Sequence, residues 1–130
     1  MVVNYIFDTN TVIYFLSNTS LNDNALEKLD KICAQGQHIS IITKLELLGY
    51  NFSSFVNESL TKEFISKSTV YAINEQVEEE TIKLRKSYKI KLPDAIIAAT
   101  AIVNKLTLIT RNTIDFKPIA ELKTVNPFEW

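Results

Sequence analysis

Short apolar runs alternate with amphipathic segments along this chain, and that alternation constrains its fold more than any other feature. The apolar runs have the length of short buried strands, at residues 3–7, 39–42, 69–73, 106–109 and 124–126. Between them, apolar residues recur at helical spacing, as in Ile96, Ala99, Thr100 and Val103. Strands that alternate with helices predict an α/β fold, in which a mainly parallel sheet is covered by helices on both faces.

Polar residues are expected to mark the helix boundaries, because only 2 Gly and 3 Pro punctuate the sequence. Residues 51–67 show the least regular pattern, with one helical face formed by Leu60, Phe64 and Ile65. The expected helix starts are at Asp8, Asn22, Thr43 or Lys44, Asn74 and Pro93.

The size of the chain predicts a single domain over residues 1–130, because 130 residues with 46% hydrophobic side chains can bury a core without disulfides. The single cysteine, Cys33, falls on an apolar helical stripe and is expected to be a packed thiol. The net charge of -1 argues against a protein that binds nucleic acid through a large positive excess.

The opening MVVNYIFDTN has no positively charged leader pattern, and no apolar run approaches the roughly 20 residues that a membrane-spanning helix needs. We therefore expect a cytoplasmic protein without a membrane segment.

Four acidic residues lie where strand-like runs end or helices begin. They are Asp8 in YIFDTN, Glu46 in ITKLELL, Asp94 in LPDAIIAATA and Asp115 in LITRNTIDF. The carboxyl ends of parallel strands meet at one edge of a sheet, so these side chains are expected to form a carboxylate pocket.

Each acid also has a simpler interpretation. Asp8 and Asp94 stand at helix starts, where an acid caps the helix or complements its dipole. Glu46 lies among apolar residues and, if buried, should have a cationic partner. Asp115 could close a turn before Phe116.

Carboxylates brought close together repel one another and take up protons unless a cation lies among them. Mg²⁺ or Mn²⁺ is the expected ion, because both prefer oxygen ligands. Zinc would favour histidine or cysteine, but His38 and Cys33 show no ligand spacing.

The chain resembles the PIN-domain family and, within it, the VapC-type toxins of toxin-antitoxin pairs. The segments that carry the resemblance are YIFDTNTVIYFL, SIITKLELLGY, LRKSYKIKLPDAIIAATA, LTLITRNTIDF and LKTVNPFEW. They follow the order and approximate spacing of the family over nearly the whole chain. The resemblance implies a three-layer α/β/α sandwich and a metal-dependent endoribonuclease.

By the resemblance, Asp8, Glu46, Asp94 and Asp115 are the catalytic acids. Asp8, Asp94 and Asp115 would bind Mg²⁺ or Mn²⁺, and Glu46 would help to bind metal or orient the attacking water. Many relatives have an aspartate at the position of Asn112, so either Asn112 or Asp115 is the fourth residue. The supporting polar positions are Thr9, Asn10, Thr43, Thr110 and Asn112.

Basic residues near the site are candidates for RNA contacts, or else ordinary surface. They are Lys44, Lys89, Lys91, Arg111 and Lys117. Arg85 matches a recurrent arginine of the family and could pair with a pocket acid or contact RNA.

The resemblance also implies partners: an RNA substrate such as tRNA, a cognate antitoxin and a second copy in a homodimer. Tyr50, Phe52 and Phe55 are candidate contacts for the antitoxin, or core residues.

Two other functions compete with the nuclease. A non-catalytic PIN-like module that binds RNA or protein would keep the fold and lack turnover. A phosphoacceptor receiver domain would need an aspartate at the end of its third strand, where this chain has Asn74.

Overall fold

The computed structural model describes residues 3–18, 20–50 and 55–130, without the side chains of Phe55 and Val56. Its centre is a five-stranded sheet in the order β3-β2-β1-β4-β5, and all four strand pairs are parallel. The strands are β1 (Tyr5–Phe7), β2 (His38–Ser40), β3 (Thr69–Tyr71), β4 (Thr107–Ile109) and β5 (Thr124–Val125). The expected parallel sheet is thus confirmed.

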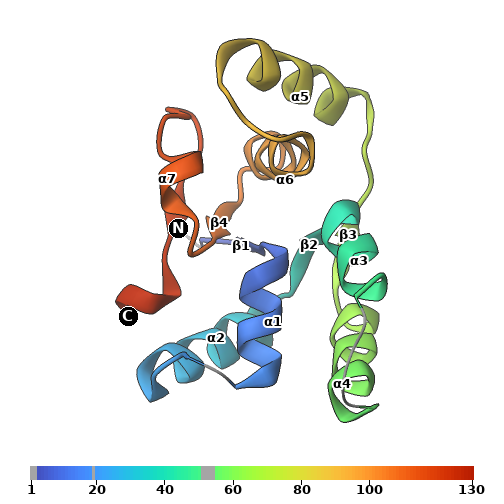
Figure 1. Ribbon diagram of the computed structural model, residues 1–130, viewed down its shortest axis with the longest axis vertical. Coiled ribbons are helices and arrows are strands. Elements are labelled where there is room, and N and C mark those ends of the chain that lie inside the picture. Colours follow the sequence, from blue (N-terminus) through green and yellow to red (C-terminus); the bar gives the residue numbers. More distant parts are fainter. Residues whose placement is uncertain (1–2, 19, 51–54) are drawn as a thin grey trace.

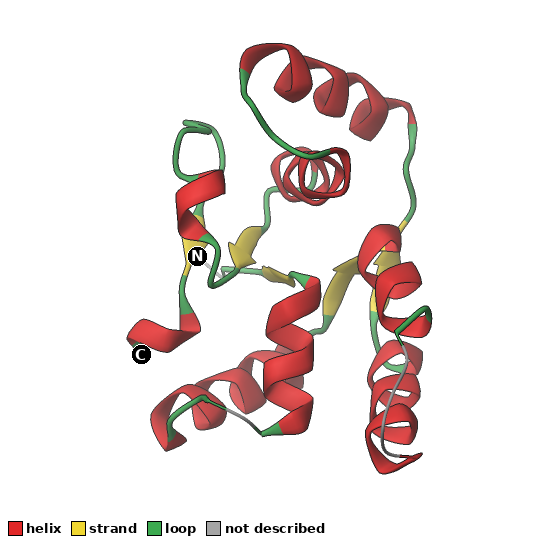
Figure 2. Ribbon diagram, in the orientation of Figure 1, coloured by secondary structure: helices red, strands yellow, loops and turns green. Residues whose placement is uncertain are grey.

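Helices connect the strands and cover both faces of the sheet (Figure 1). They are α1 (Thr9–Ser17), α2 (Asp23–Gln35), α3 (Ile41–Leu48), α4 (Phe55–Ser66), α5 (Glu75–Ser87), α6 (Leu92–Val103) and α7 (Thr113–Phe116), with a final 3₁₀ turn, η1 (Pro127–Glu129). In the view of Figure 2, α5 and α6 lie above the strands, and α1, α2 and α4 lie below them. This arrangement confirms the expected three-layer α/β/α fold.

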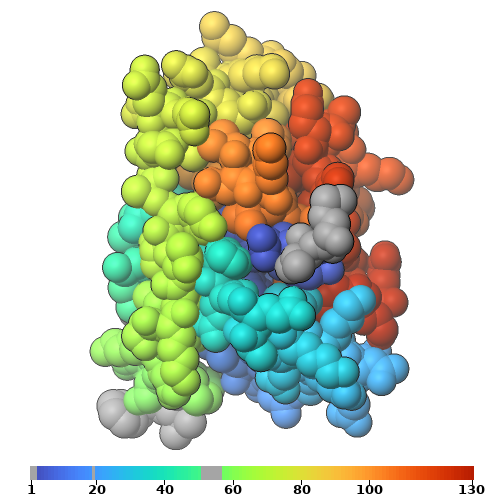
Figure 3. Space-filling view, turned by 180° about the vertical axis from the view of Figure 1, so that it is seen from behind, coloured from blue at the N-terminus to red at the C-terminus, as the bar shows by residue number. Residues whose placement is uncertain are grey.

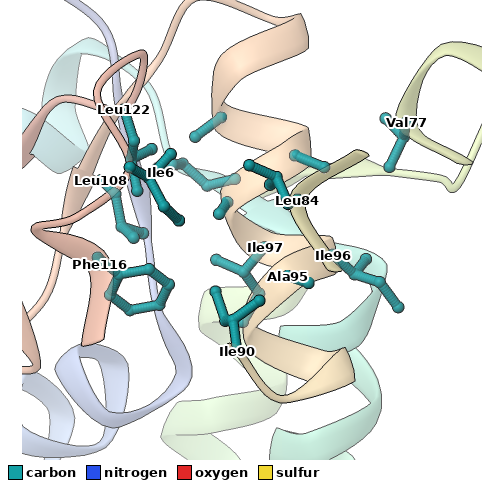
Figure 4. Packing of buried hydrophobic residues seen from close by; sticks show 14 of the residues in the cluster. Ile6, Val77, Leu84, Ile90, Ala95, Ile96, Ile97, Leu108, Phe116 and Leu122 are labelled. Atoms are coloured by element: carbon teal, nitrogen blue, oxygen red, sulfur yellow. The ribbon is translucent and has the colours of Figure 1, made fainter. Parts of the chain in front are cut away.

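Two hydrophobic clusters fill the two faces, because successive strand residues point to opposite sides of the sheet. Ile6 and Leu108 pack with α5, α6 and α7 (Figure 4). Phe7 and Ile109 pack with the helices of the other face, where the Phe7 ring meets that of Phe64 edge-on with centroids 5.7 Å apart. Burial on both sides explains why the strands are continuously apolar.

Helix α6 contains an unbroken run of buried residues, from Ala95 to Ala101. It packs between α5 and the sheet, and in Figure 3 its orange surface lies directly below the yellow surface of α5. Short alanine side chains let this helix approach its neighbours closely. The start of α6 is therefore held in a fixed position relative to the sheet edge.

Several expected boundaries are confirmed. Asn22 caps α2 by accepting a hydrogen bond from the Ala25 N–H at 2.8 Å, and Asn74 caps α5 by accepting one from the Val77 N–H at 2.9 Å.

Cys33 is partly buried against the hydrophobic cluster that contains Phe7 and Ile109, and burial raises the pKa of its thiol to about 11.

Three expectations were wrong in detail. Ile41 and Ile42 belong to α3, because Ser40 caps that helix by accepting a hydrogen bond from the Ile42 N–H at 3.1 Å. Residues 113–116 form the short helix α7, where the sequence suggested only a turn. Leu60 is 39% exposed, so it does not share the buried face of Phe64.

No helix in the described ranges is both long and apolar enough to cross a membrane.

Candidate active site

The candidate site lies at the carboxyl edge of the sheet, beyond the paired strands β1 and β4. Phe7 is in register with Ile109, so the residues that follow them, Asp8 and Thr110, are neighbours. The Asp8 N–H donates to the Ile109 carbonyl at 3.2 Å, and the Thr11 hydroxyl donates to the same carbonyl at 2.9 Å. These bonds fix the start of α1 against the end of β4.

Asp8 is buried and caps α1. Its Oδ1 accepts a hydrogen bond from the Thr11 N–H at 2.8 Å, as the capping interpretation predicts. Burial raises the pKa of Asp8 above its ordinary value, and the charge of Glu46 raises it slightly further. Hydrogen bonds from Thr11 and Thr110 oppose this rise by stabilising the carboxylate. Capping and a pocket role are therefore compatible for this residue.

Glu46 faces the site from α3, where its side chain is exposed. The Thr9 hydroxyl donates to Glu46 Oε1 at 2.5 Å, and Thr9 Oγ1 lies 3.2 Å from the hydroxyl oxygen of buried Thr43. Glu46 is exposed and lacks the cationic partner that a buried glutamate was expected to need, since no ion pair among the described residues includes it. The two threonines hold the carboxylate instead.

Asp94 lies in the first turn of α6 and is half-buried. Burial is the main cause that raises the pKa of its carboxyl, followed by the negative charges of Asp115, Asp8 and Glu46. The positive charge of Lys91 acts in the opposite direction. Three carboxylates, from α7, the N-cap of α1 and α3, thus lie close enough to Asp94 for their charges to act on it.

Asp115 is exposed on α7, and its position depends on the two polar residues after β4. Asn112 Nδ2 donates to Asp115 Oδ2 at 2.9 Å, and the Asn112 N–H donates to Thr110 Oγ1 at 3.0 Å. Since Thr110 also hydrogen bonds to Asp8, a continuous polar chain joins Asp8 to Asp115.

A hard divalent cation fits the chemistry of this set, because its donors are carboxylate, hydroxyl and amide oxygens and the negative carboxylates repel one another. As the side chains stand, no three acidic, histidine or cysteine residues in the described part of the chain are close enough to hold one metal ion. The structure therefore gathers the acids without converging them on a single point.

The remaining candidates are divided between the site and its surroundings. Asn10 is exposed on α1 and Lys44 is partly buried on α3. Arg111 stacks over the Phe128 ring, 4.4 Å from its centroid, and its Nη1 lies 3.4 Å from the Tyr14 hydroxyl. The aromatic rings therefore hold the Arg111 side chain against α1 and η1.

Arg85 makes a structural contact next to the site. Its Nη1 donates to the Ile90 carbonyl at 2.8 Å and so fixes the connection between α5 and α6. The side chain also borders a pocket of about 400 Å³, which is lined by Arg85, Lys89, Ile90, Lys91, Asp94 and Asp115.

Sequence reasoning missed Thr11, whose backbone and side chain both stabilise the site. The available signal was its place in DTNT, three residues after the capping Asp8, where the N–H meets the cap. Its hydroxyl bond to Ile109 joins residues 98 positions apart and has no local signal.

These observations define a parallel α/β sandwich with acidic residues at the carboxyl edge of its sheet. The chain belongs to the PIN domain family, whose model matches residues 5–122. The resemblance expected from the sequence is confirmed. No curated protein matches the chain significantly.

Several solved structures share the fold. A chain of a toxin-antitoxin complex from Klebsiella pneumoniae is 35% identical with a TM-score of 0.73, and the match covers 95% of this chain and 98% of that one. A chain of VapBC2 from Rickettsia felis, bound to a DNA fragment from the promoter, is 25% identical with a TM-score of 0.79 and the same coverages, 95% and 98%. A chain of VapBC-1 from nontypeable Haemophilus influenzae is 26% identical with a TM-score of 0.75 over 96% and 98%.

Proposed function

We propose that this protein is a metal-dependent endoribonuclease and the toxin of a toxin-antitoxin pair. Membership of the PIN domain family and the likeness to chains of toxin-antitoxin complexes support a nuclease toxin. The dependence on Mg²⁺ or Mn²⁺ and the choice of structured RNA such as tRNA are the finer parts of the proposal.

One observation carries it: the charges of Asp8, Glu46 and Asp115 all act on the half-buried Asp94. A structural carboxylate gains nothing from three like charges, and each of them makes its ionisation more costly. Carboxyl groups perturbed in this way cluster at cation-binding and catalytic sites.

Asp8, Asp94 and Asp115 would hold the cation. When bound, the cation would make water more acidic and stabilise negative charge on the phosphate. Glu46 and Asp115 are exposed, so rotation of their side chains is the movement that would draw the set together.

The protein's own residues would bind and orient the reactants. Thr9 holds Glu46 Oε1, which places a proton acceptor where it can orient an attacking water. Asn112 holds Asp115 in the same way, through the hydrogen bond from its Nδ2 to Asp115 Oδ2. RNA would then be cut by hydrolysis of a phosphodiester, with water as the nucleophile and no covalent protein intermediate.

The proposed partners are an antitoxin and a second copy of the chain. The matching chains at 35% and 26% identity come from a toxin-antitoxin complex and from VapBC-1, which supports an antitoxin partner. Of its candidate contacts, Tyr50 is 52% exposed, whereas Phe52 and the Phe55 side chain lie outside the described residues. We propose a homodimer that acts in the cytosol, where its RNA substrate would be met.

The deciding experiment is cleavage of a total tRNA pool by wild type and Asp94→Asn, each with Mg²⁺, Mn²⁺ or EDTA. We expect wild type to cleave only with metal and folded Asp94→Asn to leave the RNA intact. Circular dichroism of both proteins checks the fold. Substantial cleavage by the folded variant would remove Asp94 from the mechanism, and RNA binding without any cleavage by wild type would favour a non-catalytic binding module.

A further inference from the structure

The pocket beside Asp94 carries both signs of charge. Its lining combines the exposed cationic side chains of Arg85, Lys89 and Lys91, called the positive wall below, with the carboxylates of Asp94 and Asp115. The ion pairs found among the described residues lie on α2 and at α4 and involve none of these three cations. The positive wall is therefore available to a ligand.

The backbone that carries this wall is fixed. Buried Ile90 anchors the connection between α5 and α6 in the core, and its carbonyl accepts the hydrogen bond from Arg85 at 2.8 Å. The Lys91 carbonyl accepts from the Ala95 N–H at 2.9 Å, which ties the same segment to α6. The Cα atoms of Lys89 and Lys91 are thus held on either side of an anchored residue, next to the helix turn that bears Asp94.

The Lys91 side chain does not cap its helix. Lys91 occupies the capping position of α6, but its side chain makes no capping hydrogen bond, and Pro93 supplies the helix start. A lysine is a poor cap, since its ammonium group donates and cannot accept from an N–H. Helix formation therefore does not explain a cation at this position.

We propose that Lys89 and Lys91, with Arg85 behind them, bind a backbone phosphate of RNA next to the phosphodiester at the acidic site. This inference rests on the proposed function, because it takes the substrate to be RNA. A cationic wall beside the acids holds the polyanion that the acids alone would repel, and it sets the direction in which the strand crosses the site. Among the described residues that line this pocket, Lys44, Arg111 and Lys117 are absent. Arg111 stacks on aromatic rings instead.

The test compares RNA binding by wild type, Lys89→Gln/Lys91→Gln and a control, Lys83→Gln/Lys123→Gln. The control removes the same charge from other surfaces: Lys83 borders Glu79 and Glu80 on α5, and Lys123 lies beside Glu121 near the amino ends of the strands. The probe is a fluorescein-labelled single-stranded RNA of mixed sequence. Its anisotropy is followed in EDTA over a series of KCl concentrations, so that no cleavage is required.

We expect the pocket variant to bind about tenfold or more weakly at ~0.1 M salt, and its log-log salt slope to fall by about 0.7, because one phosphate contact on a single strand contributes roughly that amount. The control should stay within about twofold of wild type after allowance for net charge. Lys89→Arg/Lys91→Arg should restore binding, since arginine keeps both charges.

Equal binding and equal slopes for the pocket and control variants would overturn the inference and point to another occupant, such as an acidic peptide. This outcome is separable from failure of the proposed function, which is judged by cleavage in wild type and Asp94→Asn. Because the charge of Lys91 also acts on Asp94, RNA affinity in EDTA, and not the cleavage rate, decides the matter.

Discussion

Asn112 Nδ2 donates a hydrogen bond to Asp115 Oδ2 across 2.9 Å, and the two residues act as one unit at the start of α7. The Asn112 N–H ties this unit to Thr110 and hence to the end of β4. The sequence left open which of the two completes the site. With this contact, we expect Asp115 to supply the carboxylate and Asn112 to orient it.

Substitution of Asn112 tests whether its side-chain amide orients the Asp115 carboxylate. Asn112→Ala should raise the Mg²⁺ concentration for half-maximal tRNA cleavage by about tenfold, because partners that orient metal ligands are worth about 10–100-fold in metal affinity. The maximal rate should return at high Mg²⁺. Asp115→Asn should not recover, and its recovery to the wild-type rate would contradict a ligand role for Asp115.

Asp8 combines a capping role with a proposed metal role, and two substitutions separate them. Asp8→Asn keeps an oxygen for the Thr11 N–H and removes the charge, whereas Asp8→Ala removes both. We expect both variants to lose cleavage. Only Asp8→Ala should lose the cap, at about 1 kcal/mol of unfolding free energy, measured by urea denaturation in EDTA. Equal stability losses in the two variants would show that the charge, not the cap, stabilises the fold.

Substitutions at Thr9 test whether its hydroxyl holds the Glu46 carboxylate in position for cleavage. Thr9→Val removes the hydroxyl that donates to Oε1 and keeps the branched shape, so cleavage should fall about tenfold while the fold is unchanged. Thr9→Ser keeps the hydroxyl and is the matched control, with a rate close to wild type. A Thr9→Val enzyme as active as Thr9→Ser would mean that Glu46 needs no such partner.

The raised pKa of Asp94 predicts a pH-dependent stability difference. A carboxyl whose pKa is higher in the folded protein than in the unfolded chain favours the fold when protonated, so stability falls as pH rises from the unfolded pKa through the folded pKa. In EDTA, Asp94→Asn should therefore melt at a higher temperature than wild type at neutral pH, and the gap should close as pH falls toward about 4. Thermal melts across this range measure the gap. Added Mg²⁺ should stabilise wild type more than Asp94→Asn, because it binds the carboxylate set.

Much of the fold was predictable because its signals are local. Apolar runs gave the five strands, and asparagines at helix starts gave the caps of α2 and α5. The error at Ile41 arose because β-branched residues favour strands in isolation, while the Ser40 cap and the packing of α3 decide for helix here. Helix α7 was missed because four residues are too few for a periodic pattern.

The sequence was enough to predict which strand ends and helix starts carry the site, but not the hydrogen bonds within it. Strand ends and helix starts placed the four acids at one edge, and their mutual charge effects on Asp94 agree with that placement. The hydrogen bonds from Thr9 to Glu46 and from Thr11 to Ile109 span 37 and 98 residues and depend on how the elements pack. The exposure of Glu46 likewise follows from the orientation of α3, which its apolar sequence neighbours concealed.

The pairing of β1 with β4 has a consequence for synthesis of the protein. Tyr5 is in register with Thr107, so the first strand made is flanked by one of the last. A nascent chain that has left the ribosome only as far as α5 carries Asp8 and Glu46 but lacks Asp94, Asp115 and the strand that supports Asp8. Non-local pairings of this kind form late. The complete set of carboxylates therefore arises only near the end of translation, and truncated products of this chain are expected to be inert.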